Sequence, residues 1–223
     1  GLTRFLEEAR ILARFEHPNI VAVRRFFEAN GTAYLVMDYC DGDGVCKKLS
    51  DGGEGRGDMP LAHVPWLDAL AYTQWLSKKT GKAYRLLSEA EWEYVARANS
   101  LGAYSAESSK WAEADVADKL SQYAWFVVNS EDKPNPVGKK KPNGWGLHDV
   151  QGSVMEWTLD CWNENYGNAK ADGSPMITGD CDRRVVRGGA WNLPAESLRV
   201  SKRAGLPYEF KAANLGFRVA RTD

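Results

Sequence analysis

The chain has 223 residues, of which 43% are hydrophobic, enough for the core of one full domain with a smaller addition. Its 29 Lys and Arg residues and 30 Asp and Glu residues give a net charge of −1, so nucleic acid and anionic membranes are not expected partners. No stretch is apolar over the roughly 18 residues of a membrane helix, and no secretory signal is recognisable. A cytoplasmic location is therefore the default, or a surface or secreted one if a leader has been removed.

The first elements are a helix and a hairpin. Residues 2–15 place apolar side chains at helical spacing, which predicts an amphipathic helix that a following Pro-Asn pair ends. Residues 20–27 and 32–39 are rich in β-branched and aromatic residues and flank an Asn-Gly pair, which predicts a β-hairpin.

This N-terminal part, "FLEEARILARFEHPNIVAVRRFFEANGTAYLVMDYCDGD", resembles a piece of the small lobe of a serine/threonine kinase. The resemblance implies that Glu8 matches the helix glutamate and Met37 the residue beside the nucleotide pocket. The glycine-rich loop, the strand lysine and the catalytic aspartates are missing, so kinase activity is not expected. The chain divides into this fragment over residues 1–43, a flexible Gly-rich linker over 44–60 and a domain over 61–223.

Two helices open that domain. Residues 65–79 have a proline in the first turn and Gly81 as the stop, and five side chains share one face: Trp66, Ala69, Leu70, Thr73 and Leu76. Ser88 and Glu91 fit a capping box that starts a second helix, which runs to about Ala98. From residue 100 onward the sequence predicts short strands and long loops.

Four motifs in this domain carry a second resemblance: "VPWLDALAYTQWLSKKTGKAYRLLSEAEWEYVARA", "PNPVGKKKPNGWGLHDVQGSVMEWTLDCW", "RRVVRGGAW" and "NLGFRVAR". In this order they resemble the formylglycine-generating enzyme (sulfatase-modifying factor) family, from about Leu61 to Arg221. The resemblance implies an α+β, C-type lectin-like fold that is rich in loops, with the N-terminal helix and hairpin as an appendage. The family's opening strand and helix are not recognisable, so either the fold is incomplete or the kinase-like helix and hairpin pack in that place.

The resemblance also bears on catalysis. Active members oxidise a substrate cysteine to formylglycine with copper held by two cysteine thiolates, and the matching positions here are Leu193 and Leu198. Because leucine cannot bind copper, an enzyme is not expected and no cofactor is required. Cys161 and Cys181 bracket a polar loop and are interpreted as a disulfide or as two buried thiols, with a redox or metal role as a lesser alternative.

A calcium ion is a further possibility that the family implies. Family members bind calcium beside a GNVWEW sequence through an Asn, backbone carbonyls and a Glu. The candidate ligands here are Ser153, Val154 and Glu156, although Ser153 in place of Asn removes a side-chain carbonyl.

These observations favour a non-catalytic protein that displays a ligand-binding surface between Asn192 and Ala213 and binds a protein or cell-surface ligand. The segment resembles the variable proteins that diversity-generating retroelements rewrite. The alternatives are an oxidase or other enzyme with relocated reactive groups, and a sensor module derived from a bacterial kinase. The oligomeric state stays open. The candidate ligand-binding residues are Asn192, Leu193, Glu196, Ser197, Leu198, Ser201, Lys202, Leu206, Tyr208, Glu209, Phe210 and Lys211.

Overall fold

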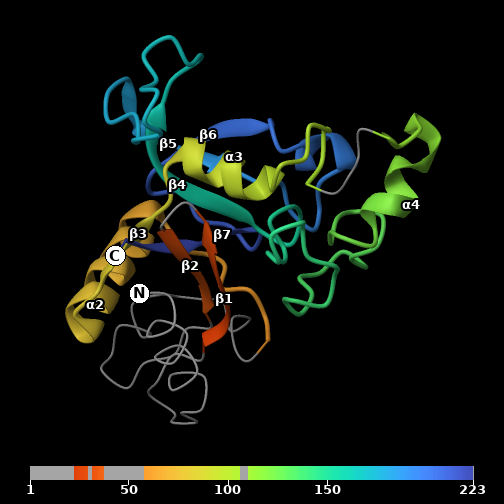
Figure 1. Ribbon diagram of the computed structural model, residues 1–223, viewed down its shortest axis with the longest axis horizontal. Helices are drawn as coiled ribbons and strands as arrows, with labels where there is room; N and C mark the ends of the chain where they lie inside the picture. The colour runs from red at the N-terminus through yellow and green to blue at the C-terminus, as the bar shows by residue number, and fades with distance from the viewer. Residues whose placement is uncertain (1–22, 30–31, 38–57, 106–109, 223) are drawn as a thin grey trace.

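The computed structural model describes residues 23–29, 32–37, 58–105 and 110–222. The helix expected over residues 2–15 and most of the expected linker lie outside these ranges. Helices and two four-stranded sheets make up the described part, which confirms the α+β class (Figure 1). No helix within it is both long enough and apolar enough to cross a membrane.

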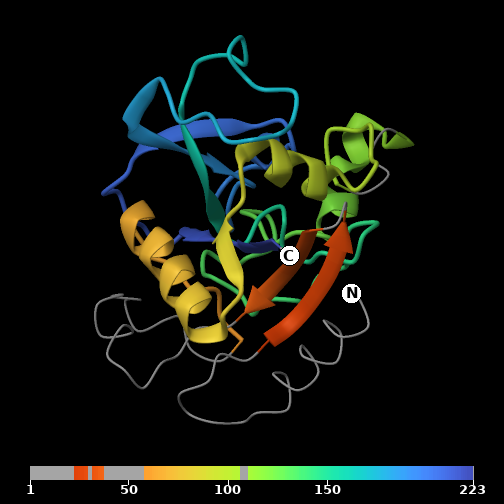
Figure 2. The same ribbon diagram turned by 60° about the vertical axis from the view of Figure 1, so that its left-hand side comes forward.

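The first sheet joins the two ends of the described chain. Its strand order is β1 (Val23–Ala29), β2 (Thr32–Met37), β8 (Val219–Thr222) and β3 (Ala83–Leu86), and all neighbours are antiparallel. The expected hairpin is thus present, and its strand β2 pairs with β8 over four residues (Figure 2). The sequence leaves open whether the fold is incomplete or whether the kinase-like helix and hairpin pack in place of the family's opening. The hairpin agrees with the second possibility, because it is part of the domain's own sheet.

The second sheet carries the motifs of the sequence's second half that resemble the family. Its order is β6 (Arg203–Pro207), β5 (Asp180–Arg187), β4 (Met155–Trp162) and β7 (Leu215–Phe217). The pairs β6–β5 and β5–β4 are antiparallel, whereas β4 and β7 are parallel. A long loop between β4 and β5 projects beyond the sheet at the upper left of Figure 1.

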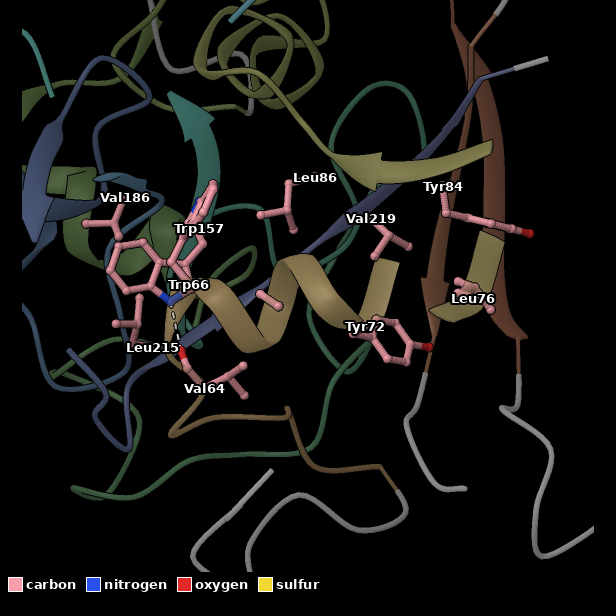
Figure 3. Close-up of a cluster of buried hydrophobic side chains, with 11 residues drawn as sticks. Val64, Trp66, Tyr72, Leu76, Tyr84, Leu86, Trp157, Val186, Leu215 and Val219 are labelled. Atoms are coloured by element: carbon pink, nitrogen blue, oxygen red, sulfur yellow. Dashed lines mark hydrogen bonds between the residues drawn. The ribbon is translucent and has the colours of Figure 1, made fainter. Parts of the chain in front are cut away.

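Helix α2 (Trp66–Thr80) matches the prediction and ends where Gly81 adopts a left-handed conformation with φ 68°. Its buried face differs in one residue from the expected face, because Tyr72 is buried and Leu70 only half-buried. The Tyr72 ring packs edge-on against Phe217 with ring centroids 5.5 Å apart, which turns this helix face toward the sheets. The core cluster beneath α2 includes Trp157, whose indole donates to the Val64 carbonyl at 2.8 Å (Figure 3).

Helix α3 (Glu89–Arg97) begins with the predicted capping box and lies across the second sheet (Figure 1). The Ser88 hydroxyl accepts from the Glu91 amide at 3.1 Å, and the Glu91 carboxylate accepts from the Ser88 amide at 2.9 Å. Ser88 also donates to the Gly173 carbonyl at 2.6 Å, so the cap ties α3 to the projecting loop. Shorter helices complete the fold: η2 (Glu113–Asp115), α4 (Val116–Leu120) and η3 (Ala195–Leu198).

We expect Ser88→Ala to lower the free energy of unfolding by about 1–2 kcal/mol, because the cap and the buried contact with the loop are both lost. Urea denaturation of both proteins measures the difference. Ser201→Ala is the matched control, since Ser201 is exposed, and it should change the value by less than about 0.5 kcal/mol. Equal effects of the two substitutions would contradict the capping role.

Candidate ligand-binding site

The candidate segment, residues 192–213, follows β5 and contains η3 and β6. Leu193, Ser197, Leu206 and Tyr208 are half-buried, whereas Leu198 is completely buried. The remaining candidates are exposed: Asn192, Glu196, Ser201, Lys202, Glu209, Phe210 and Lys211. The segment therefore presents a polar outer face and is fastened to the domain at intervals.

Leu198 departs from its expected role in binding. Its side chain has no exposed surface and packs in a cluster with Tyr104, Leu120 and Phe126. It also lies on the backbone of Gly189, where an added Cβ would come within 2.7 Å of the Leu198 Cδ1 atom. Gly189 has φ +69°, so only glycine fits without strain. In this conformation Leu198 belongs to the core and is not accessible to a ligand.

Leu193 and Leu198 also determine whether this place in the fold could bind copper. Leu193 packs against the same cluster as Leu198, so apolar side chains fill the two positions at which the family resemblance places the thiolates. Copper(I) needs soft sulfur ligands, and neither position supplies one. The residues present do not fit a copper ion there.

Sequence reasoning missed two valines beside the segment. The amide of Val127 donates to the Leu193 carbonyl at 3.2 Å, and the side chains of Val127 and Val128 are 52% and 64% exposed. The Asn129 side chain fixes this turn by accepting from the Phe126 amide at 3.0 Å. The sequence shows only two adjacent valines followed by an asparagine, which does not indicate exposure, and the segment that they adjoin is distant along the chain.

A buried charge cluster holds the middle of the segment. Arg203 donates two hydrogen bonds to the Glu89 carboxylate, at 2.7 and 2.6 Å, and Glu89 is only 2% exposed. Arg187 of the RGG motif approaches the same carboxylate at 3.4 Å and also pairs with Glu93. Tyr166 donates to Glu89 at 3.0 Å. Glu89 thus joins α3, β5 and β6 at one point.

The segment crosses three core clusters. Leu193 and Leu198 join one cluster, Val200 a second, and Leu206 and Tyr208 pack against a third, beneath α2. At its start, Asn214 donates to Asn192 at 2.9 Å. The exposed candidates are therefore spread along the outer side of the segment and are not gathered by side-chain contacts with one another.

Glu156, one of the expected calcium ligands, is hydrogen-bonded to side chains of the protein. Arg218 donates to both oxygens of the buried Glu156 carboxylate, at 2.7 and 3.0 Å, and Trp92 donates to it at 2.7 Å. A guanidinium cation thus already neutralises Glu156. Ser153 is buried with a hydroxyl that has no hydrogen-bond partner. No group of three His, Cys, Asp or Glu side chains in the described ranges could hold a metal ion. The Glu156 carboxylate, bound by Arg218 and Trp92, does not fit as a calcium ligand in this conformation.

Asp149 lies near Glu156 and Arg218, and burial raises the pKa of its carboxyl group. The folded state then binds this proton more tightly than the unfolded state, so the resulting stability is present at low pH and lost as pH rises through the folded pKa. Asp149→Asn should therefore stabilise the protein more at pH 7 than at pH 4, relative to the wild type, in urea denaturation at both pH values. Exposed Asp118→Asn is the control, and an equal pH dependence for both variants would contradict the expectation.

Cys161 and Cys181 form a disulfide, the first of the two expected structural arrangements. The bond joins β4 to β5 at the base of the projecting loop, across a sequence separation of 20 residues.

Two small sheets, two principal helices and long loops define a C-type lectin-like domain of the formylglycine-generating enzyme type. The model of the sulfatase-modifying factor enzyme 1-like domain matches residues 21–223, and the chain belongs to this family.

Three curated relatives show the range of the family. The formylglycine-generating enzyme of Streptomyces coelicolor is 33% identical over 178 residues, which is 74% of this chain and 54% of that protein. The inactive C-alpha-formylglycine-generating enzyme 2 of Bos taurus is 29% identical over 80% of this chain and 53% of its own length. The serine/threonine-protein kinase Pkn1 of Chlamydia trachomatis is 30% identical over 75% of this chain and 25% of its own length. The chain thus spans about half the length of the first two relatives.

Two solved structures are similar in fold. PvdO from Pseudomonas aeruginosa has a TM-score of 0.66 at 30% identity, covering 97% of this chain and 76% of that one. The Treponema denticola variable protein 1 has a TM-score of 0.67 at 24% identity, covering 91% of this chain and 93% of that one. Together these likenesses confirm the C-type lectin-like fold.

Proposed function

We propose that the chain is a non-catalytic protein that binds a ligand through the outer face of residues 192–213. The observation that carries the proposal is the filling of both thiolate positions by Leu193 and Leu198, the second of them completely buried. A buried leucine that stabilises the core offers no reactive group at the place where the family's oxidation occurs.

The exposed residues support a role in recognition. Side chains such as Asn192, Glu196 and Lys202 project from a backbone that Leu198 and Arg203 fasten to the core. Polar groups on a rigid frame bind with a small loss of conformational entropy. The family also contains relatives described as inactive, so a member without catalysis has precedent.

The proposed ligand is a protein or a cell-surface molecule, and the proposed origin of the segment is diversification by a retroelement. The fold shared with a Treponema variable protein supports this origin. Diversification would change exposed positions and spare anchors such as Leu198 and Arg203.

The gene's surroundings test the proposed origin. We expect a reverse transcriptase gene beside a near-copy of the codons for Asn192 to Ala213, with differences confined to adenines of the copy. Sequencing of this locus from several isolates should show changes at codons of exposed residues and none at Leu198 or Arg203. A single invariant copy of the segment, with no reverse transcriptase nearby, would contradict diversification.

A further inference from the structure

The Cys161–Cys181 disulfide lies where the β4–β5 pairing is least regular. The register shifts between Trp157 and Cys161 and again between Cys161 and Trp162. The first half of β5 is largely exposed, whereas Val185 to Arg187 are buried. This end of β5 is therefore more exposed to solvent than the other end, and local opening is least costly in such regions. The covalent bond takes over a function that ladder hydrogen bonds serve elsewhere in the sheet.

The last part of the candidate segment is fastened to this same end of β5. The Tyr208 amide donates to the Asp182 carbonyl at 3.0 Å. The Arg183 guanidinium donates to the Gly205 carbonyl at 3.2 and 2.6 Å. Asp182 and Arg183 directly follow Cys181, so movement of this part of β5 would release both contacts.

The projecting loop makes a second attachment. The Arg203 guanidinium lies 4.6 Å from the ring centroids of both Trp162 and Tyr166. It also donates to the Asn163 carbonyl at 2.5 Å. The Tyr166 hydroxyl reaches the buried Glu89 carboxylate, which Arg203 binds as well. Trp162 and Asn163 directly follow Cys161, and Tyr166 lies in the same loop a few residues further on. The disulfide thus lies beside both of these attachments, in addition to the ladder that pairs β6 with Arg183 to Arg187 of β5.

We propose that the Cys161–Cys181 bond is a redox-controlled clamp, which in its oxidised form holds residues 203–208 in place and in its reduced form lets them loosen. Its consequence for ligand binding rests on the proposed function, because Leu206 and Tyr208 belong to the candidate surface. The clamp itself needs no ligand. Its reductant is a dithiol, either a small molecule or a protein with a reactive cysteine pair.

The difference in exposure between the two cysteines determines which sulfur is attacked during reduction. Cys161 is 1% exposed and Cys181 is half-buried, so a dithiol thiolate attacks the Cys181 sulfur. A mixed disulfide forms there, and the Cys161 sulfur leaves as a thiolate and takes a proton. The second thiol of the reagent then displaces Cys181. The protein gains two electrons and two protons, and the dithiol is oxidised to its disulfide.

The test uses the full chain with Cys40→Ser and Cys46→Ser, so that only one bond responds to dithiothreitol. Alkylation and mass spectrometry confirm the free thiols. We expect reduction to accelerate amide hydrogen exchange in β6 and at Tyr208 by about tenfold or more, with the buried part of α3 unchanged. Tyr166 is 49% exposed, but partial desolvation of its hydroxyl and the neighbouring Glu89 charge raise its pKa to about 12, and this pKa should fall toward 10 on reduction. An otherwise identical Tyr166→Phe variant identifies that signal in the ultraviolet titration.

Three results would overturn the clamp. One is unchanged exchange in β6 after both thiols have been alkylated. Another is a bond that resists dithiothreitol until the protein unfolds. The third is accelerated exchange throughout the domain, which would mark a simple structural staple. None of these readouts involves a ligand, so the clamp and the proposed binding function fail separately.

Discussion

Glu89→Gln is expected to lower the free energy of unfolding by about 3–5 kcal/mol, because Arg203 loses the carboxylate that binds it and Arg187 keeps only Glu93. The Arg187 side chain is completely buried and that of Arg203 is 12% exposed, so water cannot replace the lost charge. The substitution also weakens the Tyr166 contact. Chemical denaturation followed by tryptophan fluorescence measures the loss.

Glu131→Gln is the matched control for this experiment. Glu131 pairs with Lys133 at 2.8 Å, but its side chain is 79% exposed and the pair is solvated. The control should change the free energy of unfolding by less than about 1 kcal/mol. If Glu89→Gln is as mild as the control, Glu89 does not join α3 to the candidate segment. Should Glu89→Gln fail to fold, Arg203→Lys supplies a graded test, since lysine keeps the charge but loses the paired hydrogen bonds.

Leu198→Ala should cost about 2–5 kcal/mol of stability, as expected for the removal of a buried leucine from a packed cluster. Glu196→Ala, two residues earlier on the exposed side of η3, should change stability by less than about 0.5 kcal/mol. Thermal and urea denaturation of the pair measures both values. A mild effect at Leu198 would mean that it lies on the surface, as the sequence alone predicts.

The parts of the fold that depend on local chemistry are predictable from the sequence. Gly81 ends α2 and the pair of Ser88 and Glu91 begins α3, and both signals lie within a few residues of the feature that they determine. The hairpin β1–β2 follows from composition and turn residues in the same way. Its pairing with β8 could only be raised as a possibility, because the partner strand lies at the far end of the sequence.

The candidate site is less predictable for the same reason. Sequence reasoning finds the segment and its missing thiolates, but burial along it depends on distant residues. Leu198 is buried because Tyr104 and Phe126 meet it there. Arg203 resembles any exposed arginine in the sequence, and its partner Glu89 is 114 residues away. Glu89 itself looks like an ordinary first-turn residue of α3.

The central proposal is that this chain does not carry out the family's oxidation. The most direct measurement incubates the copper-loaded protein with oxygen and a CxPxR peptide of the sulfatase type, and follows the peptide by mass spectrometry. The formylglycine-generating enzyme of Streptomyces coelicolor serves as the positive control. The account predicts that the peptide cysteine stays unmodified under conditions in which the control converts it. Conversion of the cysteine to formylglycine by this chain would contradict the account.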